Sequence, residues 1–219
     1  MKNLKEKRMM TYYINATREI IDEFGFEEVS IRKIADRSGY NSATLYNYFK
    51  NLEVLLIYAS IGYLEDYIIE LRSRLKEVKT PKEKYIMVYK VFNEFSFKNP
   101  DIYFNMFYGN QSKYLPEIIK DYYEIFPEEL GSNADEDIND MLREGNIFQR
   151  DFKVTKSFLK ENLLKEDDIA FLVSVVVRVH ATYLYEVIYD KEIEIGKHSE
   201  KFLIFMEKLI DSLMKGRVK

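Results

Sequence analysis

The 219-residue chain has no cysteine and only two histidines, His180 and His198. Disulfides, thiolate nucleophiles and cysteine-ligated zinc or iron–sulfur sites are therefore excluded, and two imidazoles are too few for a multi-histidine metal centre. The sequence also lacks the phosphate-binding, dinucleotide-binding, zinc-protease and serine-hydrolase motifs GxxxxGK, GxGxxG, HExxH and GxSxG. We therefore expect a protein that is not an enzyme and that needs no metal or cofactor.

Long apolar runs are absent as well. The most apolar stretch runs from Ile169 to Val177 and then meets Arg178, His180 and Glu186, short of the roughly 20 apolar residues that a membrane span needs. The opening MKNLKEKRMMTYY has basic residues but no apolar stretch typical of a secretory signal. We expect a cytoplasmic protein with no membrane partner.

The formal net charge of −4 hides two basic regions near the N-terminus. Residues 30–50 contain four bases and one acid, and residues 1–8 contain the same numbers. Because DNA binding depends on the local charge that meets the phosphates, the acidic total does not exclude it. For the tail at residues 2–8, a disordered extension and an arm in the minor groove both remain open.

Apolar residues recur at three- and four-residue intervals along most of the chain, which predicts an all-α fold without strands. A first helix ends at Gly25, a short second runs from Ser30 to Gly39, and a third spans residues 42–50 behind an Asn41 cap. The other expected helices cover residues 53–78 (one long helix), 80–98, 101 onward, 116 onward, 134–144, 167–189 and 199–215. The sequence does not fix the helix boundaries between residues 127 and 165, those of the 134–144 helix included.

The second and third of these helices, joined by a turn containing Gly39, have the pattern of a helix-turn-helix. Leu45 and Phe49 lie four residues apart on one face, which leaves the other side chains free to face outward. Small residues at the start of such a helix let its backbone approach base edges, while hydroxyl groups bond bases or phosphates and Asn47 can read adenine.

The run SIRKIADRSGYNSATLYNYFKNLEVLL, preceded by Phe24-Gly25-Phe26, resembles the N-terminal domain of the TetR (tetracycline-repressor) family. The resemblance covers about residues 8 to 58, and the later helices match the family only in number, length and order. The residues that carry it are Gly25, Ser30, Ile34, Ala35, Gly39, Thr44, Leu45, Tyr46, Phe49, Glu53 and Leu55.

The resemblance implies a DNA-binding surface, with Thr44 and Tyr48 on phosphates. Its expected residues are Arg32, Ser42, Ala43, Thr44, Tyr46, Asn47, Tyr48 and Lys50. The family commonly has lysine where this chain has Leu52, at the start of the fourth helix, where a helix N-terminus meets a phosphate. Lys50 is the candidate substitute. Tyr40 stands where the family usually has a smaller aliphatic residue. Two roles are open for it, packing in the turn, which we favour, and contact with the backbone.

We expect two domains, a DNA-binding domain at residues 1–51 and a helical ligand-binding and dimerisation domain at residues 52–219. Only Arg178 and Glu186 are charged between Ile169 and Tyr189, so this helix needs burial on two sides, either wholly within one chain or partly against a partner. Pairing with the last helix predicts a homodimer with a four-helix interface. Its expected residues are Val176, Tyr183, Phe202, Met206, Leu209 and Leu213.

Phenylalanine and tyrosine make up 13 of the 42 residues from 85 to 126. Such density predicts either a plain core or a pocket for an apolar or aromatic effector, and the family favours the pocket. Nearby acids (Glu65, Asp66, Glu70, Glu94) favour a cationic ligand and Arg178 an anionic one, and the sequence does not choose. The expected ligand-binding residues are Tyr67, Tyr89, Phe92, Phe104, Phe107, Tyr123 and Arg178.

Together these observations predict a ligand-responsive transcriptional regulator. It would bind a pseudo-palindromic double-stranded operator as a homodimer, act as a repressor, and be released by an unidentified small molecule. A constitutive DNA-binding dimer and an activator without an inducer remain alternatives.

Overall fold

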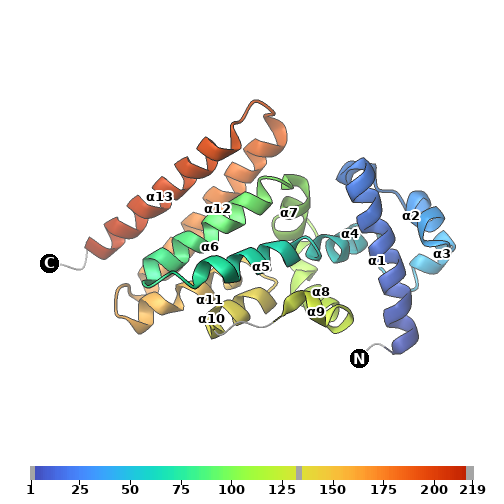
Figure 1. Cartoon of the computed structure of the whole chain (residues 1–219), viewed down its shortest axis with the longest axis horizontal. Coiled ribbons are helices and arrows are strands. Elements are labelled where there is room, and N and C mark those ends of the chain that lie inside the picture. Colours follow the sequence, from blue (N-terminus) through green and yellow to red (C-terminus); the bar gives the residue numbers. More distant parts are fainter. Residues whose placement is uncertain (1–2, 132–134, 216–219) are drawn as a thin grey trace.

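The computed structural model describes residues 3–131 and 135–215, and all regular structure in these ranges is helical. The predicted all-α fold is confirmed. Figure 1 shows three N-terminal helices gathered at one end and a longer helical body that ends in two long neighbouring helices. The three are α1 (Leu4–Phe24), α2 (Ile31–Ser38) and α3 (Ser42–Leu45), and the last two are α12 (Glu166–Tyr189) and α13 (Ile195–Lys215).

Helix α1 begins inside the basic tail. The Asn3 side chain accepts a hydrogen bond from the Glu6 backbone N–H, the Glu6 carboxylate accepts one from the Asn3 N–H, and this capping box starts the helix at Leu4. The described part of the tail is therefore neither a disordered extension nor a separate arm, whereas Lys2 lies outside the described residues. Gly25, with φ of 97°, ends α1 before the short 3₁₀ helix η1 (Phe26–Glu28).

The expected caps of the next two helices are present. The Ser30 hydroxyl accepts from the Lys33 N–H, Gly39 ends α2 in the left-handed conformation (φ 74°), and Asn41 accepts from the Ala43 N–H. The predicted extent of the third helix is wrong, because α3 stops at Leu45 and not at residue 50. Bonds between residues three apart then tighten the chain into turns, from Asn47 N–H to Thr44 and from Tyr48 N–H to Leu45.

The long helix predicted from Glu53 to Val78 is also wrong. It is two helices, α4 (Leu52–Ile61) and α5 (Leu64–Leu75), separated at Gly62 and Tyr63. There the N–H of Tyr63 bonds to the Ser60 carbonyl, again three residues back. Glycine at this break leaves room for a side chain from α1, since a Cβ at Gly62 would lie 2.1 Å from the Arg18 Nη2.

The remaining helices build the body. Thr80 and Glu83 form the cap that starts α6, and Asn99 precedes Pro100 at the start of α7, as the sequence predicts. The body helices are α6 (Pro81–Ser96), α7 (Pro100–Phe107), η2 (Ser112–Tyr114), α8 (Leu115–Ile125), α9 (Pro127–Leu130), α10 (Glu136–Arg143) and α11 (Ile147–Lys160). The predicted start of α10 at Ala134 lies outside the described residues.

Helix α12 lies in the body and packs against α7, α11 and α13. It is the single helix within the described ranges that is long and apolar enough to cross a membrane by length and composition. One side of α12 is fully buried, with Leu172, Val176 and His180 at 0% exposure, and the opposite side exposes Phe171 and Tyr185 at 53% and 50%. Helix α12 is therefore a core helix whose second face carries exposed apolar side chains that the rest of the described chain does not cover.

Candidate functional site

The predicted recognition surface lies at the outer end of the N-terminal helices (Figure 1). Leu45 and Phe49 are buried at 0% and 1% exposure, and the Phe49 ring packs edge-on against Tyr13 and Tyr58. Because these two side chains point inward, the opposite side of residues 42–50, which we call the α3 segment, faces outward. The predicted DNA-binding residues on it are exposed (Ala43, Tyr46, Asn47, Lys50) or half-buried (Ser42, Thr44, Tyr48), and the Arg32 side chain on α2 is 92% exposed.

Two of the four basic side chains in residues 30–50 form close ion pairs with acids. Arg37 forms ion pairs with Glu19 and Glu23 of α1, and Lys33 Nζ lies 2.7 Å from Glu28. Arg32 lies 4.0 Å from the exposed Asp36 carboxylate, too loose a pair to neutralise it. The local positive charge predicted from the sequence is therefore reduced by the fold.

Lys50, the candidate substitute for a lysine at position 52, points its Nζ at the Tyr114 ring, 5.3 Å from the ring centroid. The half-buried Leu52 is the first residue of α4, behind the Asn51 cap that accepts from the Val54 N–H at 2.9 Å. Tyr40 is exposed, and its ring packs at a tilt against that of Tyr12 with centroids 5.5 Å apart, which agrees with the packing expectation.

A half-buried ion pair joins α1 to the body. Arg18 forms a two-pronged contact with Glu129 of α9, with Nη1–Oε1 and Nη2–Oε2 distances of 3.1 and 3.2 Å. Its guanidinium also lies over the rings of Tyr122 and Phe126, and the Tyr122 hydroxyl donates to Glu129. The same guanidinium lies beside Gly62, between α4 and α5, where a Cβ would meet it.

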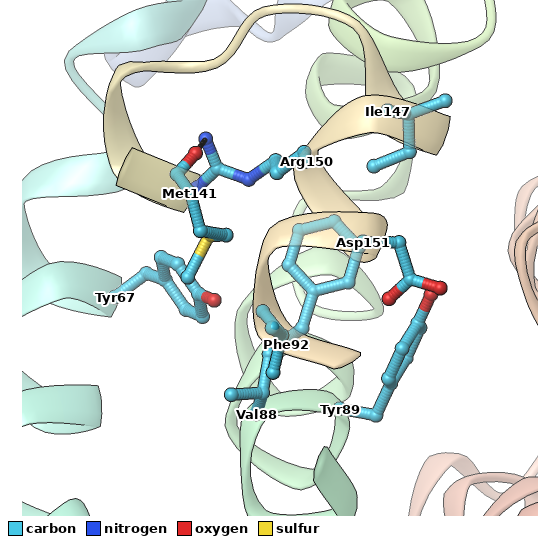
Figure 2. A pocket seen from close by; sticks show the side chains of 9 residues that line it. Tyr67, Val88, Tyr89, Phe92, Met141, Ile147, Arg150 and Asp151 are labelled. Carbon is cyan, nitrogen blue, oxygen red and sulfur yellow. Dashed lines mark hydrogen bonds between the residues drawn. The ribbon is translucent and has the colours of Figure 1, made fainter. Parts of the chain in front are cut away.

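A small cavity lies inside the body between α5, α6, α10 and α11, with a volume of about 20 Å³. That is room for about one water molecule. Figure 2 shows aromatic and aliphatic side chains around it, with Arg150 and Asp151 entering from α11. It is lined by Tyr67, Val88, Tyr89, Phe92, Met141, Ile147, Arg150, Asp151 and Val154.

Two neighbouring ionisable residues of α11, Arg150 and Asp151, line this otherwise largely apolar cavity. Asp151 is 5% exposed, and burial raises the pKa of its carboxyl to about 7 although the Tyr85 hydroxyl donates to it at 2.7 Å. Arg150 is 4% exposed, and its Nη1 donates to the carbonyl oxygens of Met141, Leu142 and Glu144 near the end of α10. Its Nη2 has no hydrogen-bond partner.

Three of the predicted ligand-binding residues, Tyr67, Tyr89 and Phe92, line the cavity. Phe107 lies under the Arg150 guanidinium at 5.4 Å from it, whereas Phe104 and Tyr123 are half-buried away from the lining.

Arg178, expected to be buried and to bind a ligand, is instead exposed and bonds back to the Ser174 carbonyl on the free face of α12. The acids proposed for a cationic ligand do not line the cavity either. Glu65 and Asp66 are exposed, and Glu70 and Glu94 form ion pairs with Arg74.

Sequence reasoning missed Arg150 and Asp151. They lie in α11, a helix that was not predicted although Gly145 directly precedes its cap, Asn146, which accepts from the N–H groups of Phe148 and Gln149. The available signal was the pair of opposite charges at i, i+1 among apolar residues at helical spacing.

The predicted interface residues separate into two groups. Val176, Phe202 and Met206 are fully buried within this chain's own core, so they have no surface left for a partner. Tyr183, Leu209 and Leu213 are half-buried. The large apolar residues exposed on the same two helices are Phe171, Tyr185, Tyr189, Ile195 and Ile204.

Across the described residues, no group of three or more histidine, aspartate or glutamate side chains is arranged to hold a metal ion.

Residues 14–59 match the family model for bacterial regulatory proteins of the tetR family. A fatty acid metabolism regulator protein of Bacillus subtilis (strain 168) is 35% identical over 88 residues, which is 40% of this chain and 44% of that relative. The matched part therefore spans less than half the length of this curated relative.

Solved structures share the fold along most of the chain. The TetR-family repressor FadR of Thermus thermophilus, in complex with lauroyl-CoA, superimposes with a TM-score of 0.60 at 18% identity, covering 90% of this chain and 93% of that one. RolR in complex with resorcinol gives a TM-score of 0.61 at 14% identity over 99% and 97% of the two chains.

The sequence match falls on the module with the exposed recognition surface, and the fold match extends through the helical body. The family match covers residues 14–59, and the helical body shares the fold of TetR-family regulators of known structure.

Proposed function

We propose that this protein is a ligand-responsive repressor that binds a pseudo-palindromic operator as a homodimer and leaves it when a small molecule occupies the body. The single observation that carries the proposal is the ion pair between Arg18 and Glu129. It fixes the helix-turn-helix module to a body that contains a cavity with an unpartnered buried guanidinium nitrogen.

The α3 segment is the part that would enter the major groove, with Tyr46 and Asn47 facing outward from its turn and Arg32 beside it on α2. A dimer would place two such segments about 34 to 36 Å apart, one turn of duplex DNA. The exposed aromatic residues of α12, Phe171, Tyr185 and Tyr189, support a two-fold contact through this helix and α13. This placement revises the sequence expectation toward the uncovered face of α12.

The effector would bind at the cavity in the body. The relatives favour an apolar acyl compound, since one regulates fatty acid metabolism and another was solved with lauroyl-CoA. The aromatic lining of Tyr67, Tyr89 and Phe92 supports an apolar body for the ligand. A ligand that fits only a widened cavity would favour a different spacing of the two recognition segments. A hundredfold loss of operator affinity requires only about 2.7 kcal/mol of such coupling.

The test starts with selection of operator sequences from random DNA by the full-length protein, followed by gel shifts with and without lauroyl-CoA. We expect release by lauroyl-CoA and loss of binding in Tyr46→Ala, whose side chain is 55% exposed and anchors nothing in the core. Ile69→Ala on α5, 58% exposed, is the matched control and should bind normally. Release by no acyl compound would favour a constitutive regulator, and retained binding by Tyr46→Ala would remove the recognition assignment.

A further inference from the structure

The start of α1 carries an exposed stripe that the predicted recognition surface does not include. Lys5, Arg8 and Tyr12 are all exposed, and their three- and four-residue spacing puts them on one side of the helix. Lys7 points elsewhere, because its Nζ donates to the Glu124 carbonyl of α8 at 2.9 Å. One side of this helix end therefore contacts the body, and another presents exposed basic side chains.

Arg8 is held in place by the tyrosine one turn later. Its guanidinium lies over the Tyr12 ring, 5.9 Å from the centroid, and its Nε donates to the Tyr12 hydroxyl at 3.3 Å. Throughout residues 3–131 and 135–215, no carboxylate lies within ion-pair distance of Arg8 and no acceptor bonds its Nη groups. One edge of the guanidinium is therefore oriented, and its other N–H groups are available to a ligand.

Tyr40 connects this arginine to the turn between α2 and α3. Its ring packs against those of Tyr12 and Tyr13, with centroids 5.5 and 6.0 Å away. The Tyr13 hydroxyl in turn donates to the carbonyl of Asn41, the cap of α3, at 3.3 Å. These contacts fix the start of α1 beside the start of the α3 segment. We call Arg8, Tyr12 and Tyr40 the arginine shelf.

Several positions near the α3 segment offer no unengaged base to a phosphate. Lys33 and Arg37 are paired with acids, and Lys50 lies against an aromatic ring. Leu52 stands where the family commonly has lysine. A helix in a major groove needs contacts to the phosphates that border the groove, because these set its register on the duplex. Arg8 can supply one, and it precedes residues 14–59, the part that matches the family model.

We propose that the arginine shelf is a second DNA contact, in which Arg8 binds a backbone phosphate beside the major groove that receives the α3 segment. The Nη groups form a fork that matches the geometry of phosphate oxygens. Tyr12 and Tyr40 are positioning residues, because they hold Arg8 beside the segment. The contact positions the module and reads no base. It rests on the proposed function in placing the α3 segment in a groove.

Gel shifts of the full-length protein at several salt concentrations test this contact. The probes are a duplex that the protein selects from random DNA and an unrelated duplex of the same length. Arg8→Gln should weaken binding to both by the same factor, about tenfold at low salt. It should also make the slope of log affinity against log salt shallower by about 0.9. Lys90→Gln, which removes an exposed base of α6, is the matched control and should keep the parent's slope.

Two conservative variants separate a positioned contact from general charge. Arg8→Lys keeps the charge, so the slope should stay as in the parent while affinity falls, because lysine offers no fork to the phosphate. Tyr12→Phe keeps the ring but removes the hydroxyl that orients Arg8, and should cost about fivefold in affinity, the equivalent of one net hydrogen bond. The same change should cost nothing in an Arg8→Gln background. All these side chains are exposed, so the variants should remain folded.

The outcomes distinguish this proposal from the proposed function. An Arg8→Gln protein with the parent's slope, or one whose loss falls on the selected duplex alone, overturns the phosphate contact. An equal cost of Tyr12→Phe in both backgrounds overturns the positioning role of Tyr12. If Tyr46→Ala abolishes operator binding while Arg8→Gln leaves the slope unchanged, this proposal fails and the proposed function stands. If the parent protein selects no duplex, both fail.

Discussion

At the scale of single residues, Leu52 is where this chain departs from the family pattern in its DNA-binding module. It occupies the first position of α4, where the helix N-terminus offers free N–H groups to a phosphate. We expect Leu52→Lys to strengthen operator binding. The added contact should steepen the slope of log affinity against log salt by about 0.9.

Gel shifts at several salt concentrations measure this slope. Ile69→Lys on α5 adds the same charge to an exposed site far along the chain and should change the slope little. Equal slopes for Leu52→Lys and the parent protein would show that the start of α4 does not meet a phosphate, or that Lys50 leaves Tyr114 to make this contact already.

The buried Asp151 carboxyl leads us to predict that the stability of the fold depends on pH. Burial raises its pKa from 3.8 to about 7, so between these values the folded protein binds more protons than the unfolded chain. Stability from this group is therefore lost as the pH rises from about 4 to 7. The loss is on the order of 4 kcal/mol, because each unit of pKa difference corresponds to about 1.4 kcal/mol.

Asp151→Asn keeps an acceptor for Tyr85 but cannot ionise. Relative to the parent protein, this variant should gain stability steadily from pH 4 to pH 7 and then no more. Urea denaturation at pH 4.5, 6 and 8 measures the difference. A difference that stays constant with pH would mean that the carboxyl is solvated in the folded protein.

At the scale of elements, the sequence predicts helices well where one residue type dictates the backbone. Gly25, Gly39 and the Thr80–Pro81 pair mark helix ends in the structure as they do in the sequence. It fails where a distant side chain decides. At the break between α4 and α5, the Arg18 guanidinium, from a residue more than forty positions earlier, lies beside Gly62, a contact that local periodicity cannot show.

The same distinction applies to the candidate sites. The inward position of Leu45 and Phe49 was predicted from their spacing, whereas Ser42, Thr44 and Tyr48, expected to face outward, are half-buried. The role of this surface in DNA binding stays a prediction. Arg178 has mostly apolar neighbours in the sequence and Arg150 lies between Gln149 and Asp151, yet the structure buries Arg150 and exposes Arg178, an outcome that only packing decides.

The contact between Arg18 of α1 and Gly62, at the break between α4 and α5, leads to a prediction about stability. Gly62 has ordinary helical dihedrals (φ −59°, ψ −28°), so alanine suits its backbone and should stabilise by about 0.4 to 1 kcal/mol. An alanine Cβ would however lie 2.1 Å from Arg18 Nη2 and push it from Glu129. We expect Gly62→Ala to destabilise the parent protein and to stabilise an Arg18→Ala variant.

A double-mutant cycle by urea denaturation measures the reversal of sign. The same effect in both backgrounds would mean that Arg18 moves aside at no cost. Gel shifts with the Gly62→Ala protein add the functional readout, because a loosened ion pair should weaken the response of the operator complex to effector while leaving recognition intact.

At the scale of the whole molecule, the division into domains at residues 51 and 52 stays a prediction, and α4 shows why a sharp boundary misleads. This helix packs on α1 on one side and on α7 and α8 on the other. With the Arg18–Glu129 ion pair, it gives the recognition module two attachments to the body. Under the proposed function, these two attachments would transmit a change in the body to the module as a rigid movement.

From the uncovered face of α12 we predict where two copies of the chain meet. Phe171, Arg178 and Tyr185 repeat every seven residues along one exposed stripe, the spacing with which one helix lies along another. Two copies of this helix crossing at a two-fold axis would bury Phe171 and Tyr185 against their counterparts. We expect Phe171→Glu combined with Tyr185→Glu to convert a dimer to a folded monomer, because four carboxylates would then meet in an apolar contact.

Light scattering gives the mass, and circular dichroism confirms that the helices remain, since neither side chain belongs to the chain's own core. Ile69→Glu, a charge placed at an equally exposed apolar residue of α5, should leave the dimer intact. The monomer should also lose operator affinity, because one module alone reads only half of the site. A double variant that still has the mass of a dimer would place the interface elsewhere on the body, and with it the geometry that sets the spacing of the two recognition segments.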